Sequence, residues 1–204
     1  MVSVITGDIV NSRQLKNPDI WLKPLKQVFK KLSLSEEYWE FYRGDSFQIE
    51  LKQNNKAFEA AVLIKATIKM IKGLDVRMAI GVGQKTHHGL KVTESNGPAF
   101  IHSGEAFETL KSKRSNLAIK TNDDTLDAEL NLYFKLALIA MDHWSTNASE
   151  IVKLSIENSE YSQKEIGALT GVKQNTVSEH LKRAFFSEII ELDQMYQTKI
   201  KHLI

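Results

Sequence analysis

The pattern of apolar residues changes at Asn122-Asp123-Asp124, and this change constrains the fold more than any other feature of the sequence. Before it, short apolar runs typical of strands alternate with segments whose apolar residues have helical spacing. After it, only helical spacing occurs. A chain arranged in this way is α+β, and we predict a mixed domain over residues 1–122 followed by an all-α domain over residues 123–204.

The first part is predicted to form one sheet with accompanying helices. Gly44 lies between two strand-like runs, which indicates a hairpin. The order strand, helix, hairpin, helix, strand, helix, strand suits an antiparallel or mixed sheet with helices on one face. The predicted strands cover residues 2–7, 37–43, 47–52, 75–82 and 117–120, and the predicted helices cover residues 18–34, 56–72 and 102–111.

The second part is predicted to contain only helices, over residues 125–144, 147–158, 162–169 and from 174 onward. The final helix is apolar over much of its surface. We therefore expect it to pack on the helix at 125–144 or on a second subunit.

Charge and cysteine content exclude several kinds of protein. The formal net charge is only +2, so any contact with nucleic acid must depend on local placement of charge. The sequence has no cysteine, which excludes disulfide frameworks and thiolate metal sites. No apolar run is long enough to span a membrane and residues 1–8 do not resemble a secretion signal, so we expect a cytoplasmic protein without a membrane partner.

Two carboxylates in the first part are candidates for a metal site. Asp8 ends the first predicted strand, and Asp45 lies in the turn of the hairpin. If these strands are neighbours, the two side chains can converge, and such a pair can bind magnesium together with phosphate oxygens. Asp is also a common residue in turns, where it needs no ligand.

The residues that follow Asp8 are candidates for binding phosphate. They lie at a predicted strand-to-helix junction, where backbone amides can surround an anion and Arg13 adds positive charge. The phosphate-binding candidates are Asn11, Ser12 and Arg13.

Three segments of the first part resemble the class III nucleotide cyclase domain. They are Gly7-Asp8-Ile9-Val10-Asn11-Ser12, Tyr42-Arg43-Gly44-Asp45-Ser46-Phe47 and Val76-Arg77-Met78-Ala79-Ile80-Gly81-Val82-Gly83, and the resemblance extends over residues 1–115. It implies a ferredoxin-like sheet of the nucleotide cyclase type. It also implies that Asp8, Asp45 and the carbonyl group of Ile9 bind metal ions and that the loop after Asp8 binds phosphates.

A later cyclase motif is altered in this sequence. The motif has Asn and, four residues on, Arg, which stabilise the transition state, and Ile101 and Glu105 take these places here. Isoleucine cannot orient a ribose, and glutamate would repel the negative charge that develops on phosphate. We therefore expect binding of a nucleotide or a metal at most, with no cyclic nucleotide formed from ATP or GTP.

Residues 162–183 have the pattern of a helix-turn-helix. Ser162 and Glu165 form a capping-box pattern that marks the start of a helix, and Gly171 suits the left-handed residue that ends one. Gly167 is small where the two helices must approach each other. The apolar positions of this register are predicted to face inward, and they are Ile166, Leu169, Val172, Val177 and Leu181.

The outer face of the second helix is predicted to contact DNA. Glutamine and asparagine can bind adenine edges, and lysine and arginine can bind phosphates. Because so few of these residues are basic, we expect a homodimer that presents two such helices. A small helical bundle with a polar, protein-binding face is the alternative. The predicted DNA-binding residues are Lys173, Gln174, Asn175, Thr176, Ser178, Lys182 and Arg183.

The whole chain resembles the SatD family of bacterial proteins. The segments Gly7–Arg13 and Ser162–Ile166, together with Trp144, carry this resemblance. We expect a DNA-binding transcriptional regulator whose first domain senses a nucleotide or serves for dimerisation. The alternatives are a metal-dependent enzyme acting on a nucleoside triphosphate and a protein-interaction module that binds no nucleic acid.

Overall fold

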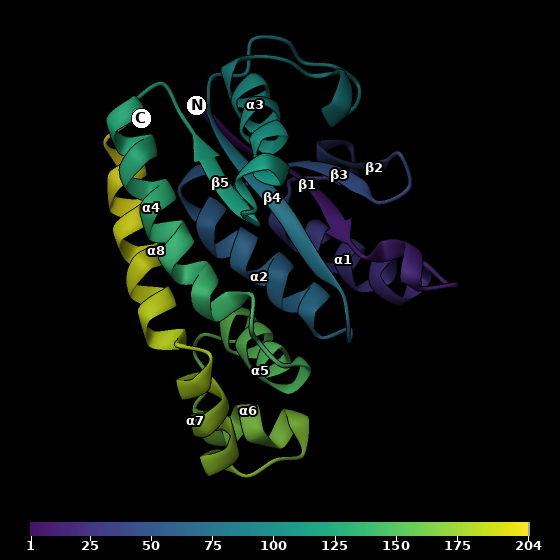
Figure 1. The fold of residues 1–204 in the computed structure, drawn as a ribbon, viewed down its shortest axis with the longest axis vertical. Coiled ribbons are helices and arrows are strands. Elements are labelled where there is room, and N and C mark those ends of the chain that lie inside the picture. The colour runs from purple at the N-terminus through teal and green to yellow at the C-terminus, as the bar shows by residue number, and fades with distance from the viewer. Residues whose placement is uncertain (204) are drawn as a thin grey trace.

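Five strands form one mixed sheet in the computed structural model, which describes residues 1–203 (Figure 1). The strand order is β2-β3-β1-β4-β5. Neighbouring strands are antiparallel except β4 and β5, which are parallel because a helix connects them. The strands are β1 (Val2–Val10), β2 (Trp39–Tyr42), β3 (Ser46–Glu50), β4 (Asp75–Gly83) and β5 (Leu117–Lys120).

The helices confirm the predicted α+β class, and the part after β5 is helical as far as the structure describes it. The segment after residue 174 is divided into two helices by Phe185, whose φ is 53°. Within residues 1–203, no helix combines the length and hydrophobicity needed to cross a bilayer. The helices are α1 (Asp19–Leu32), α2 (Ala57–Lys69), α3 (Pro98–Lys113), α4 (Asp124–Met141), α5 (Thr146–Glu157), α6 (Gln163–Thr170), α7 (Gln174–Arg183) and α8 (Phe186–Lys201).

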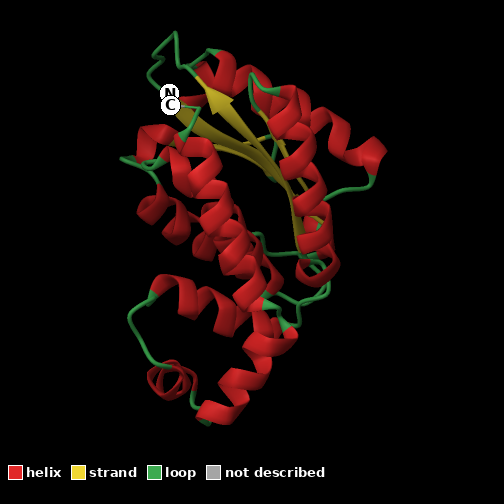
Figure 2. Ribbon diagram, turned by 90° about the vertical axis from the view of Figure 1, so that its left-hand side faces the viewer, coloured by secondary structure: helices red, strands yellow, loops and turns green. Residues whose placement is uncertain are grey.

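Helices cover both faces of the sheet, so the prediction of helices on one face is wrong. Successive side chains of a strand point to opposite faces. Val4 packs with Phe100 of α3, whereas the next residue, Ile5, packs in the main core with α1 and α2. Figure 2 shows the strands between helices on either side. Strand order alone does not determine the face on which a connecting helix lies, which explains the error.

The main hydrophobic core extends across the predicted domain boundary. Phe58 of α2 stacks on Phe134 of α4 with ring centroids 4.9 Å apart, and Tyr196 of α8 lies 6.3 Å from the Phe134 ring. All three residues belong to the same apolar cluster as the residues of β1 and β4. The expected packing of the final helix on α4 is therefore observed, and the division into domains at 122–124 stays a prediction.

Asp193 of α8 caps the N-terminus of α2 and so connects the end of the chain to the sheet-forming part. Its carboxylate accepts hydrogen bonds from the backbone N–H of Glu59 at 3.1 Å and from the Gln197 amide at 2.5 Å. The side chain is buried. Burial raises the pKa of the Asp193 carboxyl, although these hydrogen bonds act in the opposite direction.

Asp193→Asn is expected to change the pH dependence of stability. Because the folded pKa is raised, the folded chain binds the proton more tightly than the unfolded chain. The parent protein therefore loses stability as the pH rises from the unfolded value of about 3.9 through the folded pKa. Asparagine keeps an acceptor for the Glu59 amide and does not titrate. In urea unfolding, the free energy of unfolding of the variant should rise relative to that of the parent protein between about pH 4 and pH 7. If the two proteins had parallel pH profiles, a buried charge at Asp193 would be contradicted.

Candidate functional site

Helices α6 and α7 lie at one end of the molecule and are joined by a short turn (Figure 1). The predicted capping box begins α6, because the Ser162 N–H donates to the Glu165 carboxylate at 2.8 Å and the Glu165 N–H donates to the Ser162 hydroxyl at 3.4 Å. Gly171 ends α6 with φ 72°, in the left-handed region. Both local predictions are therefore confirmed.

The two helices approach each other at Gly167. A Cβ atom there would lie 2.6 Å from the carbonyl oxygen of Val172, so a side chain would displace the turn. Ile166 of α6 and Val177 of α7 pack with Ile151 of α5 in a small apolar cluster. This cluster fixes which face of α7 is turned to the protein.

Two apolar positions that were predicted to face inward lie at the surface. Leu169 is 56% exposed and Val172 is 37% exposed. Val172 contacts Gly167 through its backbone, which leaves its side chain outside. The short helix α6 buries only Ile166 and Gly167, so Leu169 has no buried face to occupy.

The opposite face of α7 is polar and open to solvent. Lys182 and Lys173 have no carboxylate partner among residues 1–203, and Arg183 forms an exposed ion pair with Glu179 at 2.9 Å. Val177 is the one fully buried residue of α7. The structure brings together on this face, all exposed, the seven predicted DNA-binding residues: Lys173, Gln174, Asn175, Thr176, Ser178, Lys182 and Arg183.

The two carboxylates of the first part lie at the same end of the sheet. Asp8 of β1 pairs with Ser46 of β3, and the Ile9 N–H donates to the backbone carbonyl of Asp45 at 3.1 Å. The carboxylates themselves bind different partners. The Asp45 carboxylate accepts a hydrogen bond from the Ser12 hydroxyl, whereas the Asp8 carboxylate accepts one from Arg77 of the neighbouring strand β4.

Arg77 of β4 neutralises Asp8, and the sequence analysis did not identify it. Its guanidinium donates to the two oxygens of Asp8 at 2.9 and 2.6 Å. The two residues lie directly opposite each other in the β1–β4 register. The signal in the sequence was a charged residue between two apolar ones, Val76-Arg77-Met78, but only strand pairing connects it with Asp8.

Asp8, Ile9 and Asp45 lie at the same end of the sheet, and each of the two carboxylates already accepts a hydrogen bond from a neighbouring side chain. Both oxygens of Asp8 accept hydrogen bonds from Arg77, so a cation at Asp8 would lie beside the positive charge of the guanidinium. Within the described residues, no group of three or more His, Asp or Glu side chains is arranged to hold a metal ion. Magnesium binding stays a prediction.

The predicted phosphate-binding residues lie in the turn after β1. Asn11 has a left-handed φ of 66°, and its amide donates to the Gly73 carbonyl at 3.0 Å, while Arg13 is exposed. The helix that follows is a single 3₁₀ segment, Ser12–Gln14, and not an α-helix. So short a segment adds little dipole to attract an anion, and the phosphate site stays a prediction.

Ile101 and Glu105 lie on exposed positions of α3. Lys120 of β5 donates to the Glu105 carboxylate at 2.5 Å, and this hydrogen bond lowers the pKa of Glu105. The side chain is therefore negatively charged at neutral pH. A negative charge here would repel the charge that develops on phosphate. That the chain forms no cyclic nucleotide stays a prediction.

Comparison with known proteins identifies a family. A family model described as the SatD family matches residues 2–197. The solved structure of the active GGEEF domain of a diguanylate cyclase from Vibrio cholerae is similar at 18% identity, with a TM-score of 0.41, over 60% of this chain and 83% of that chain. That likeness is too distant to support an argument about activity. No curated protein sequence matches the chain.

Proposed function

This chain belongs to the SatD family, and we propose that it binds double-stranded DNA through α7 and acts as a transcriptional regulator. One observation carries the proposal: six residues of α7 that are able to bind bases or phosphates, and Lys173 just before the helix, are all exposed, whereas the helix buries only Val177. An α-helix fits the major groove of B-DNA. Helix α7 lies at one end of the molecule, so a duplex can approach it (Figure 1).

The order of residues along α7 suits a recognition helix. Lys173 precedes the helix, and Lys182 and Arg183 end it, so positive charge lies at both ends. These charges can bind the phosphates on either side of the groove. Gln174, Asn175 and Ser178 lie between them and are exposed, and their amide and hydroxyl groups are of the kinds that bond base edges. Base recognition and phosphate binding are thus separated along one helix.

Fluorescence titration of duplexes should show DNA binding with a modest salt dependence. Three basic residues per copy give a slope of log K against log salt of about −3 for one chain and about −5 for two. Lys182→Ala should weaken binding to all sequences and reduce the slope by about 1 for each chain bound. Asn175→Ala should cost roughly 1–3 kcal/mol at a preferred site only.

Lys26→Ala, which removes the same charge from an exposed position of α1, is the matched control and should leave binding unchanged. Absence of binding by the parent protein at low salt would overturn the proposal. So would equal weakening by Lys26→Ala and Lys182→Ala, because binding would then depend on overall charge and not on α7.

We further propose that residues 1–122 form a regulatory part of the nucleotide cyclase type without cyclase turnover. The Asp8–Arg77 pair and the Glu105 carboxylate support this assignment, because neither favours a reacting triphosphate. A metal-dependent enzyme acting on a nucleoside triphosphate would bind its cation at Asp8 against the repulsion of the Arg77 guanidinium. A protein-interaction module would use the polar face of α7 for a protein partner instead of DNA.

A further inference from the structure

We propose that an apolar stripe on α4 is the interface between two copies of this chain, with the two α4 helices parallel. The stripe consists of Leu132, Leu136 and Ile139, which are 55%, 56% and 69% exposed. The other side of α4 is also apolar and is buried in the main core. A helix that is apolar on both sides is normally buried on both, so the stripe requires a partner.

The spacing of the stripe indicates that the partner is a helix. Its residues follow each other at intervals of four and three, which is the spacing along the seam of a coiled coil. Residues at these positions pack against the same positions of a second helix. The same helix of a second copy provides the matching seam without any other partner.

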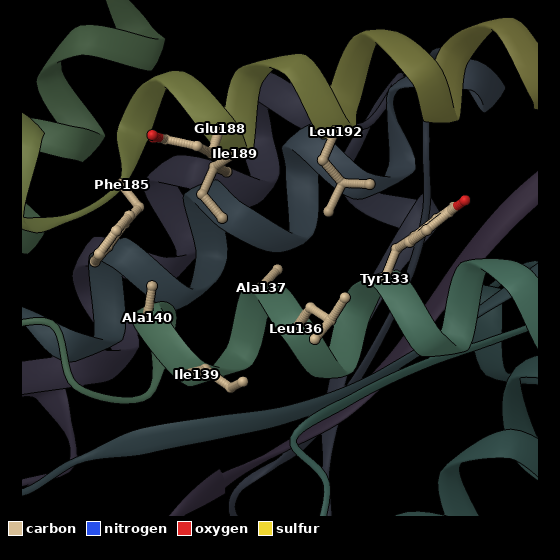
Figure 3. A pocket seen from close by; sticks show the side chains of 9 residues that line it. All are labelled: Tyr133, Leu136, Ala137, Ile139, Ala140, Phe185, Glu188, Ile189 and Leu192. Carbon is tan, nitrogen blue, oxygen red and sulfur yellow. The ribbon is translucent and has the colours of Figure 1, made fainter.

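An apolar groove beside the stripe adds a place for side chains of the second copy. It lies between α4 and α8 and has a volume of about 380 Å³. Figure 3 shows Leu136, Ile139 and Ala140 of α4 on one side, with Ile189 and Leu192 of α8 and the preceding Phe185 on the other. The stripe and the groove together form one continuous apolar face.

Charges on the two sides of the stripe determine the orientation. Lys135 lies on the side of β5, where it lines a cavity with Leu117 and Ala118, and Glu188 lies on the side of α8. Neither has an ion-pair partner within residues 1–203. A twofold axis parallel to α4 exchanges the two sides, so that Lys135 of each copy faces Glu188 of the other. An antiparallel pair would bring the two Lys135 side chains together instead.

The parallel arrangement places both α6–α7 pairs at the same end of the dimer, because α4 runs toward that end (Figure 1). Two recognition helices at one end can bind neighbouring half-sites of one duplex. This consequence rests on the proposed function, whereas the interface itself rests on the stripe, the groove and the charges.

Single-cysteine variants test the orientation directly, because the sequence has no cysteine. In the parallel dimer, Leu132→Cys and Ile139→Cys should each form a disulfide with the same position of the second copy on mild oxidation. In an antiparallel dimer, cross-linking would require a mixture of the two variants, and this outcome would overturn the orientation. Ile20→Cys, at an exposed position of α1, is the control and should not cross-link.

Sedimentation without DNA tests the interface. The parent protein should contain two chains and Leu136→Asp one, with an unchanged far-ultraviolet circular dichroism spectrum because Leu136 lies at the surface and its loss leaves the fold of each chain intact. Lys135→Glu should weaken association about fivefold, and adding Glu188→Lys should restore it. A monomeric parent protein, or a dimer that Leu136→Asp leaves intact, would overturn the proposal.

The same variants separate failure of the interface from failure of the proposed function. A dimer with the expected cross-links that binds no DNA at low salt would leave the interface standing and overturn DNA binding. A monomer that binds DNA through α7 would overturn the interface and leave the proposed DNA binding standing.

Discussion

Gly81→Ala is expected to lower the free energy of unfolding by about 3 kcal/mol or more. Gly81 lies on β4, in the interior of the sheet, directly beneath α3. An added Cβ atom would lie 2.0 Å from the carbonyl oxygen of Ala99 and 2.4 Å from the backbone nitrogen of Ser103. These are backbone atoms, so the whole helix would have to move, and the hydrogen bond between Ser103 and Thr6 would be lost with it.

Urea unfolding of Gly81→Ala and Gly104→Ala provides the measurement and its control. Gly104 lies in the interior of α3, and no atom lies within 4 Å of a Cβ added there. Alanine should therefore stabilise α3 at this position by up to about 1 kcal/mol, because glycine is a poor helix former. If the two substitutions had similar effects, the close packing of α3 on β4 would be contradicted.

Lys65→Met is expected to destabilise the chain by roughly 3–5 kcal/mol. Lys65 of α2 is 1% exposed, and its ammonium group lies 2.7 Å from the carboxylate of Asp75 and 2.6 Å from that of Asp142. These partners lie at the start of β4 and at the end of α4, so one side chain connects three elements. Methionine fills a similar volume but removes the cation that lies between the two carboxylates, and Lys69, 3.5 Å from the Asp75 carboxylate, compensates only in part.

Thermal or urea unfolding should separate Lys65→Met clearly from Lys23→Met. Lys23 forms an exposed ion pair with Asp19 at 3.1 Å, and such pairs contribute at most about 1 kcal/mol. Adding Asp142→Asn to Lys65→Met should recover part of the loss, because it removes one of the two repelling charges. Equal effects of the two lysine substitutions would show that the buried pair does not stabilise the fold.

Local patterns in the sequence were sufficient to predict where most elements lie. The strand predicted over residues 117–120 has those bounds in the structure. Helix α3 begins at Pro98, four residues before the predicted start. Gly97-Pro98 has the appearance of a loop, although proline is favoured in the first turn of a helix. The face of the sheet on which α3 packs could not be predicted, because it depends on tertiary contacts.

Features of the candidate site that depend on residues close together in the sequence could be predicted. Features that depend on contacts between distant segments could not. The exposure of the α7 residues follows from helical periodicity around Val177 and Leu181, which the sequence contains. The Asp8–Arg77 pair depends on the register of two strands that are distant in sequence. The exposure of Val172 depends on a backbone contact with Gly167, which no pattern of side chains reveals.

The cluster of Ile151, Ile166 and Val177 is distinct from the main core, and Leu181 of α7 packs against both. Helix α6 buries only Ile166 and Gly167, and α7 buries only Val177, so we expect the two helices to open together while α2, α4 and the sheet stay folded. Such a unit has its own, lower opening free energy. A ligand held by α7 would suppress this local opening and slow amide exchange in α6 and α7, while exchange in the main core would continue to report global unfolding.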